Sequence, residues 1–127
     1  MQKNKPLVSI IINCYNGEQF LPQCIKSIQK QTYKNFEVIF WNNKSTDKSS
    51  IIYGKIKDKR FKYFLAKNKT NLYKARNLAL QKTKGKLIGF LDVDDLWLPN
   101  KLYDQISYFK DETIGVVYSK LWVLNEK

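Results

Sequence analysis

Short apolar runs recur along the chain and are separated by segments in which apolar residues follow a helical period. The runs are rich in β-branched and aromatic residues, which are typical of strands. They occupy residues 7–12, 36–41, 61–65, 87–91 and 114–118. Strands that alternate with helices predict a mainly parallel sheet covered by helices on both faces, the doubly wound α/β architecture. We therefore expect an α/β fold with a strand at each run.

The first two helices are predicted by apolar stripes and by polar residues placed to cap them. Residues 18–31 carry one stripe, and Asn16 is placed to cap it, with Gln19 three residues later completing a capping-box pattern. Residues 46–59 carry a second stripe and follow Ser45, a residue type that favours the N-cap. Each of these helices is thus expected to begin on its own local signal.

Two further helices are predicted in the second half of the chain. Pro99 suits the first turn of the last one, because its fixed φ and missing N–H cost nothing there. The apolar positions are Leu72, Ala75, Leu78 and Ala79 in the third helix, and Leu102, Ile106 and Phe109 in the fourth.

Polar clusters follow three of the predicted strands. They are "NCYN" at 13–16, "NNKSTD" at 42–47 and "DVDD" at 92–95. In open α/β sheets, ligands bind outside the carboxyl ends of the strands, near the point where the strand order reverses. We therefore expect these clusters to form the functional site.

Composition limits the classes of protein to consider. The 127 residues suit a single domain, and the formal charge of +12 suggests an anionic partner such as nucleic acid, an acidic membrane surface or a phosphorylated substrate. The chain has two cysteines and no histidine, so a disulfide framework, the usual zinc sites and Ser-His or Cys-His catalysis are disfavoured. Any bound metal must be held by oxygen ligands.

The apolar runs are too short for a membrane span or a secretory signal. The longest near the N-terminus, residues 7–12, is followed by no small-residue cleavage pattern. No run approaches the roughly 18 apolar residues of a spanning helix. A cytoplasmic location is the resulting expectation.

Three acids within four positions are the strongest chemical signal in this basic chain. Asp92, Asp94 and Asp95 follow an apolar run directly, and their like charges repel. The sequence has no G-x-G-x-x-G and no P-loop, so glycine-rich phosphate sites are excluded. Mg²⁺ or Mn²⁺ would offset the repulsion, because these cations take a few carboxylate ligands and complete their shell with phosphate and water. Helix capping would explain one of the three, Asp95, but not all.

Several motifs together resemble a known family. The motifs are "VSIIINCYN", "SIQKQTYKNFEVIFWNNKSTD", "ARNLAL" and "GKLIGFLDVDDLWLPNKL". In order and spacing, they resemble the nucleotide-binding half of a family 2 glycosyltransferase with the Rossmann-like GT-A fold, over residues 7–118. The resemblance implies one nucleotide-sugar-binding domain over residues 1–127, as the truncated N-terminal part of a longer catalytic domain.

The resemblance also implies roles for individual residues. Asp94 and Asp95 match the metal and diphosphate position, with Asp92 near the ribose. Tyr15 matches the aromatic residue that stacks on a uracil-type base, with an aromatic packed at a strand end as its alternative. Arg76 matches a basic residue near the nucleotide sugar, with a surface arginine paired to a neighbouring acid as its alternative.

The chain departs from the family pattern at three places. Asn13 stands where the family usually has Pro, and it belongs to the implied nucleotide-binding set with Asn43. Asn42 and Asn43 replace two aspartates, the second of which accepts a hydrogen bond from the base. Asn keeps a carbonyl acceptor but adds a donor and loses the charge, so base preference is expected to shift. Asn71 replaces a glycine and tolerates a left-handed backbone better than most residues.

The implied function is metal-dependent transfer of a sugar from a nucleotide-diphosphate sugar to an acceptor hydroxyl. A UDP-sugar is the favoured donor, a glycan or lipid-linked molecule the acceptor, and surface polysaccharide synthesis the setting. Peripheral attachment to an anionic inner leaflet would use the positive charge. The catalytic base is unknown. The acids that follow the acid cluster are interpreted as solvated surface residues. They are Asp104, Asp111, Glu112 and Glu126.

Three other functions remain open. A nucleotide-sugar-binding remnant would share the site but lack turnover. "FLDVDD" resembles the start of haloacid-dehalogenase-type phosphohydrolases, with Asp92 as nucleophile, although Leu96 and the position on the fourth strand argue against it. The basic and aromatic string "RFKYFLAK" invites a single-stranded nucleic-acid module. The same segment is also typical of an edge strand, and the acid cluster would repel a phosphate backbone. No nucleic-acid partner is therefore expected.

Overall fold

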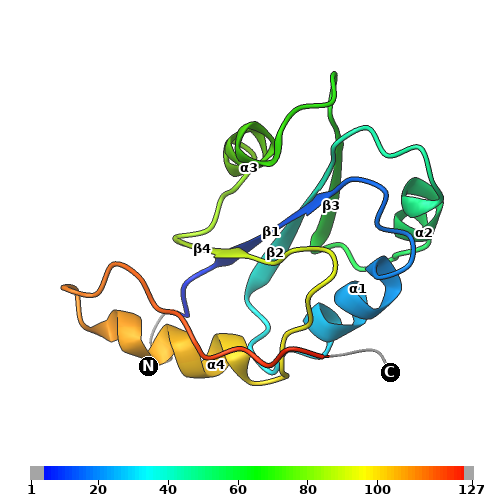
Figure 1. The fold of residues 1–127 in the computed structure, drawn as a ribbon. Coiled ribbons are helices and arrows are strands. Elements are labelled where there is room, and N and C mark those ends of the chain that lie inside the picture. The colour runs from blue at the N-terminus through cyan, green and yellow to red at the C-terminus, as the bar shows by residue number, and fades with distance from the viewer. Residues whose placement is uncertain (1–4, 125–127) are drawn as a thin grey trace.

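The computed structural model describes residues 5–124 of the chain, which form a single sheet with helices on both faces (Figure 1). The strands are β1 (Val8–Cys14), β2 (Phe36–Asn42), β3 (Phe61–Leu65) and β4 (Leu87–Phe90). The helices are α1 (Leu21–Gln29), α2 (Ser49–Gly54), α3 (Leu72–Leu80), α4 (Lys101–Ile106) and the 3₁₀ turn η1 (Ser107–Lys110). Among these helices, none has the length and apolar character needed to cross a bilayer.

The strands are all parallel and lie in the order β3-β2-β1-β4. The chain moves outward from β1 to β2 and β3, then returns past β1 to form β4 on its other side. Strand order therefore reverses beside β1. Every residue of β2 is buried and nearly every residue of β1, as expected for central parallel strands covered on both faces. The predicted α/β fold class is confirmed.

Alternate residues of β1 and β2 build two separate cores. Val8, Ile10 and Ile12 face α1, α2 and α4 in the larger core, which is closed by Leu21 and Leu102 among others. On the opposite face, Ile11, Ile39 and Trp41 pack against the two small residues Ala75 and Ala79 of α3. Small side chains let α3 lie close to the sheet, and this places the start of α3 beside the carboxyl ends of β1 and β2.

At the amino end of the sheet, the buried acid Glu37 connects several segments by hydrogen bonds. The Glu37 carboxylate accepts hydrogen bonds from the Ser9 hydroxyl and the Lys84 N–H, both at 2.6 Å, and from the Lys62 ammonium at 2.5 Å. Burial alone would raise the pKa of Glu37, but these hydrogen bonds and the Lys62 charge outweigh it and lower that pKa. Gly85 completes the network by donating to Ser9 at 2.8 Å, and a Cβ there would lie only 2.6 Å from the Ser9 nitrogen.

The fifth predicted strand, residues 114–118, is wrong. This segment has no regular secondary structure, and Val116 and Tyr118 are more than four-fifths exposed. It runs past α4, where the Lys101 ammonium donates to the Ser119 hydroxyl at 3.0 Å, and it does not lie along the free edge of β4 (Figure 1). β-Branched composition favours a strand only where the segment pairs with a neighbouring strand, and this segment runs past α4 instead.

The predicted helix caps are also wrong. Helix α1 begins only at Leu21, after Phe20, and α2 begins only at Ser49, after Lys48; neither preceding residue makes a side-chain cap. Helix α4 likewise begins after Pro99, with Asn100 at its N-cap. Helix α3, for which no cap was predicted, does have one: the Asn71 side chain accepts a hydrogen bond from the Lys74 N–H.

The side chains predicted as caps instead join the loops after β1 and β2. The Asn16 side-chain oxygen accepts from the Thr46 N–H at 2.7 Å, and the Ser45 hydroxyl accepts from the Asn16 N–H at 3.0 Å. Further along, Asp47 accepts from the Glu18 N–H, and Glu18 accepts from the Lys48 N–H, each at 2.9 Å. These reciprocal bonds hold the two loops together at the carboxyl end of the sheet.

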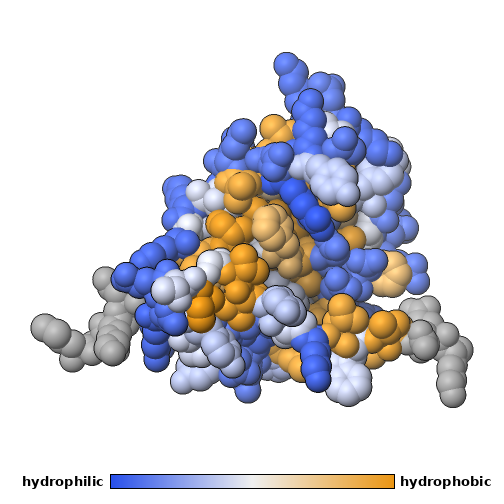
Figure 2. Space-filling model, turned by 60° about the vertical axis from the view of Figure 1, so that its left-hand side comes forward, coloured by the Kyte–Doolittle hydropathy of each residue, from blue (hydrophilic) through white to orange (hydrophobic). Residues whose placement is uncertain are grey.

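Strand β4 leaves apolar side chains uncovered. Ile88 and Phe90 are in register with Ser9 and Ile11, so they point to the α3 face, yet they are 38% and 50% exposed. The reason is that α3 packs over β1 and β2. Figure 2, which brings the β4 side forward, shows apolar side chains gathered on this face among hydrophilic surroundings.

Candidate functional site

The carboxyl ends of β1, β2 and β4 bring the three predicted polar clusters to one edge of the sheet. The first two are joined by the loop contacts described above. The third packs on the first through Gly17, where a Cβ would lie only 2.8 Å from the Val93 side chain. A side chain at residue 17 would push the acid cluster away from the loop after β1. The predicted convergence of the clusters at the strand ends is confirmed.

A pocket of about 220 Å³ lies between the ends of β1 and β2 and the start of α3. We call it the Tyr15 pocket, after the tyrosine that is 44% exposed there. It brings together three residues predicted to bind nucleotide, Asn13, Tyr15 and Asn43. Its lining is Asn13, Cys14, Tyr15, Asn43, Lys69, Thr70, Leu72 and Ala75.

Asn43 holds one wall of the Tyr15 pocket in place. Its side-chain NH₂ donates to the Thr70 carbonyl at 2.7 Å, and its side-chain oxygen accepts from the Thr70 N–H at 3.0 Å. The Thr70 hydroxyl lies 3.4 Å from the same oxygen. The Asn43 amide, which the sequence predicts to contact the nucleotide base, is therefore already hydrogen-bonded to Thr70. Its direct contact with a base stays a prediction.

Asn13 lines the pocket, and its side chain has an acceptor without a partner among the described residues. Its side-chain oxygen is buried and has no hydrogen-bond partner in the described part of the chain. An unpaired buried acceptor carries a cost of about 1–3 kcal/mol. A ligand that donates a hydrogen bond at this point would remove that cost, which agrees with the predicted place of Asn13 in a binding site.

Sequence reasoning missed two residues of the Tyr15 pocket, Lys69 and Thr70. They lie in the polar segment after β3, between Ala66 and the N-cap residue Asn71. The signal that identified the other clusters, polar residues directly after a strand, was present here too. It was weaker because lysines are common along the whole chain.

The acid cluster forms an exposed turn after β4, which we call the acidic turn (residues 92–95). The Asp95 N–H donates to the Asp92 carbonyl at 3.0 Å and closes it. Arg76, on α3, forms an ion pair with Asp92 at 2.7 Å. Two residues predicted to lie near the nucleotide are thus joined directly, and the alternative reading of Arg76 as a paired arginine is realised within the candidate site.

The remaining charge of the acidic turn is not compensated. Burial, and then the negative charges of Asp94 and Asp92, raise the pKa of Asp95. Asp95 does not cap α4, since the N-cap of that helix is Asn100. Capping therefore explains none of the three acids. Among the ion pairs of residues 5–124, Arg76 with Asp92 is the one that involves this turn.

The donor set of the acidic turn fits a hard divalent cation. Across residues 5–124, no three acidic, cysteine or histidine side chains converge into a ready-made cage. Mg²⁺ and Mn²⁺ do not need one, because one or two carboxylates with substrate phosphates and water complete their shell. Asp94 and Asp95 would supply such ligands, since Asp92 is held by Arg76.

Cys24, beneath the acidic turn, is chemically silent. Burial raises its pKa to about 12, and the charges of Cys14 and of the three aspartates add to this effect. Its thiol lies 3.9 Å from the Asp92 carbonyl oxygen, as a weak donor. Because the thiolate is the form that attacks and binds metals, burial disfavours both roles for Cys24.

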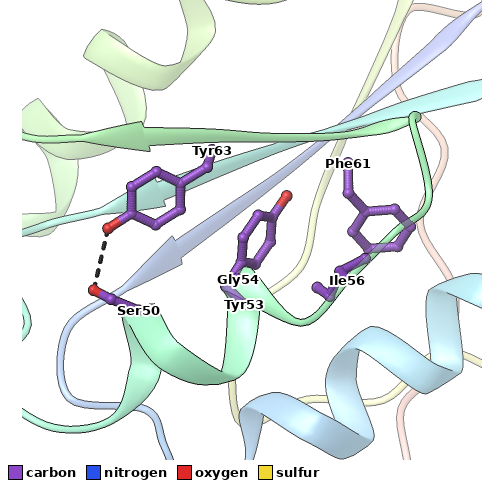
Figure 3. A pocket seen from close by; sticks show the side chains of 6 residues that line it. All are labelled: Ser50, Tyr53, Gly54, Ile56, Phe61 and Tyr63. Carbon is purple, nitrogen blue, oxygen red and sulfur yellow. Dashed lines mark hydrogen bonds between the residues drawn. The ribbon is translucent and has the colours of Figure 1, made fainter.

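A larger cavity of about 470 Å³ lies elsewhere, between α2 and β3 (Figure 3). Its walls are mainly aromatic, and the Tyr53 ring stacks on Phe40 with centroids 4.2 Å apart. The Ser50 and Tyr63 hydroxyls are 3.1 Å apart across it. Its lining residues include no carboxylate, lysine or arginine, and its polar side-chain groups are the hydroxyls of Ser50, Tyr53 and Tyr63.

The acids after the acidic turn lie on the surface. Asp104, Asp111 and Glu112 are exposed, and Asp111 accepts hydrogen bonds from the Thr113 hydroxyl and N–H, which lower the pKa of Asp111. A general base at a working site needs a pKa near the operating pH. Glu126 lies outside the described residues. No catalytic base is assigned.

Comparison with known proteins gives a family and a fold. The model of the family described as Glycosyl transferase family 2 matches residues 9–126. The Escherichia coli protein UDP-Glc:alpha-D-GlcNAc-diphosphoundecaprenol beta-1,3-glucosyltransferase WfaP is 38% identical over 117 residues, covering 92% of this chain and 47% of that protein. An uncharacterized glycosyltransferase of Haemophilus influenzae is 43% identical over 107 residues, covering 83% and 43%. The chain thus spans just under half the length of these relatives.

Two solved structures share the fold. Staphylococcus aureus TarS 1–349 in complex with UDP-GlcNAc superposes with a TM-score of 0.78 at 27% identity, over 84% of this chain and 32% of that one. The mannosyltransferase PcManGT from Pyrobaculum calidifontis, in complex with GDP-Man and Mn²⁺, gives a TM-score of 0.81 at 23% identity, over 87% and 34%.

Proposed function

The chain belongs to glycosyl transferase family 2, as its motifs predict, and from this membership we propose that it forms the donor-binding part of a glycosyltransferase. The reaction moves a sugar from a nucleoside diphosphate sugar to an acceptor hydroxyl. One observation carries the proposal: the Tyr15 pocket and the acidic turn lie on either side of β1, where the strand order reverses. This is the place where open α/β sheets bind ligands.

Each side of the site has its own task in this proposal. Tyr15 stacks on the base, and the unpaired oxygen of Asn13 accepts a hydrogen bond from the nucleoside. Asn43 keeps the wall of the pocket in place through Thr70 and so limits which base fits.

The acidic turn takes the diphosphate end of the donor. Asp94 and Asp95 hold a divalent cation, and Arg76 fixes Asp92 toward the ribose. When bound, Mg²⁺ or Mn²⁺ supplies positive charge at the departing nucleoside diphosphate. The site of this chain thereby orients the donor and compensates its charge.

The names of the relatives support a donor class and an acceptor class. WfaP is named for a UDP-glucose donor and a diphosphoundecaprenol-linked acceptor, and the TarS structure contains UDP-GlcNAc. We therefore favour a UDP-sugar as donor and a glycan or lipid-linked acceptor, in the synthesis of a surface polysaccharide.

Peripheral attachment to the inner membrane face is part of this proposal. The net charge of +12 favours an anionic lipid surface, at roughly 1 kcal/mol per well-placed basic residue. Such attachment would bring the site to lipid-linked acceptors from the cytoplasmic side. Sedimentation with vesicles tests it: equal binding to anionic and neutral lipid would contradict it.

Calorimetric titration with UDP and GDP, with and without Mn²⁺, tests the donor site. We expect Mn²⁺-dependent binding of UDP that weakens by about 100-fold or more in Asp94→Ala, because a lost metal ligand costs several kcal/mol. Glu112→Ala removes an equal charge from the surface and should leave binding unchanged. Binding of UDP that is indifferent to both Mn²⁺ and Asp94 would contradict the assigned metal position, and no binding of either nucleotide would contradict the donor site.

A further inference from the structure

Lys69 covers the aromatic face of the Tyr15 pocket. Its ammonium nitrogen lies 3.5 Å from the centroid of the Tyr15 ring, well inside the range of a cation–π contact. Both residues line the same pocket. The ring face that Lys69 covers is therefore one that the pocket would otherwise present to a ligand.

The backbone beside Lys69 is fixed, but its side chain is free to move. The next residue, Thr70, is held by the side-chain amide of Asn43 through its N–H and its carbonyl. Lys69 itself is exposed, and within the described residues its ammonium forms neither a hydrogen bond nor an ion pair. The contact with Tyr15 is weak at such an exposed position, so the side chain can leave at little cost.

The pocket is small for a ligand site while Lys69 stays over Tyr15. Its volume of about 220 Å³ is below the roughly 300–1,000 Å³ of typical ligand pockets. A planar base gains most from an aromatic side chain by stacking on its face. Because the ammonium occupies that face, a base can stack there only after Lys69 has moved aside.

We propose that Lys69 is a specificity-determining residue that covers Tyr15 in the free chain and makes the pocket select phosphorylated nucleotides over nucleosides. The inference rests on the proposed function, since it takes the stacking of a base on Tyr15 as given. A nucleoside must displace the ammonium and offers it nothing in return. A nucleoside diphosphate displaces it too, but its anionic oxygens give the ammonium a charge-assisted hydrogen bond, which is stronger than the contact it leaves.

The substitution Lys69→Ala separates these two effects, because they have opposite signs. Uridine should bind about two- to fivefold more tightly, since the exposed cation–π contact no longer competes. UDP with Mn²⁺ should bind about fivefold or more weakly, since a charge-assisted contact is lost. Both affinities can be measured by isothermal titration calorimetry on the full chain. The ratio of the two affinities is the decisive quantity.

Two control variants keep the test specific. Lys67→Ala removes the same charge from the same exposed segment and should change the ratio by less than about twofold. Lys69→Arg keeps a cation that can stack and bind phosphate, and should retain the wild-type selectivity. Equal changes for uridine and UDP in Lys69→Ala, or the same ratio as in Lys67→Ala, would overturn the inference.

The outcome for the wild-type chain separates this inference from the proposed function. If the wild-type chain binds UDP and Lys69→Ala leaves the selectivity unchanged, the role of Lys69 is refuted and the donor site stands. If the wild-type chain binds neither UDP nor uridine, the donor site itself is refuted, and the role of Lys69 with it.

Discussion

The fold places Glu37 and the acidic turn, residues 92–95, in opposite environments. Glu37, at the amino end of the sheet, is 4% exposed and accepts hydrogen bonds from Ser9, Lys62 and Lys84. The acidic turn, at the carboxyl end, is exposed, and Arg76 pairs with one of its three aspartates. The pKa of Glu37 is lowered by its partners, whereas that of Asp95 is raised by burial and by Asp94 and Asp92.

The difference shows which acid stabilises the fold and which is kept for a ligand. A buried carboxylate must be satisfied by the chain itself, or the folded state pays for its desolvation. An exposed cluster of like charges does not stabilise the fold, and a bound cation or a substrate can compensate its charge. Changes at Glu37 should therefore affect stability, and changes at the acidic turn should affect binding.

The largest expected effect on stability comes from Glu37→Ala. It leaves the Lys84 N–H and the Ser9 hydroxyl without their acceptor and Lys62 without its charge partner. We expect a loss of about 3 kcal/mol in the free energy of unfolding, measured by urea denaturation. The exposed Glu112→Ala serves as control, with a change below about 0.5 kcal/mol. A similar small change for Glu37→Ala would show that the network contributes nothing net.

The same acid should make stability depend on pH. The folded-state pKa of Glu37 is lowered from its ordinary value of 4.5. Its contribution is therefore complete above pH 4.5 and is lost as the pH falls through the lower, folded-state pKa. The difference in unfolding free energy between wild type and Glu37→Ala should shrink as urea denaturation is repeated from neutral to acidic pH. A difference that stays constant would contradict the lowered pKa.

The smallest expected effect on stability comes from Asp95→Asn. It relieves repulsion from Asp94 and Asp92, but the turn is exposed and solvent screens the charges. We expect the chain to become slightly more stable, by about 0.5 kcal/mol or less, in thermal unfolding. The same variant should weaken Mn²⁺-dependent UDP binding. A marked loss of stability would mean that Asp95 serves the fold as Glu37 does, and the comparison between the two ends would fail.

Local patterns predicted much of this molecule. Windows of a few residues predict the first four strands, the four helices and the polar clusters at strand ends. They do so because the spacing of apolar residues in a segment reflects which of its side chains are buried. The placement of Tyr15, Asn43 and Asp92 at one edge of a parallel sheet follows from the order of elements alone.

Contacts between distant residues decided the rest. Asn16 and Ser45 have the right chemistry for helix caps, but their best partners lie about thirty residues away, in the neighbouring loop. Residues 114–118 have the composition of a strand, yet a strand forms only by pairing with another, and this segment runs past α4 rather than along β4. Lys69 looks like any of the chain's lysines until the fold places it over Tyr15. The sequence by itself determined which segments form strands and helices and where the acids stand; tertiary structure decided which polar groups find each other, because those partners are close only in space.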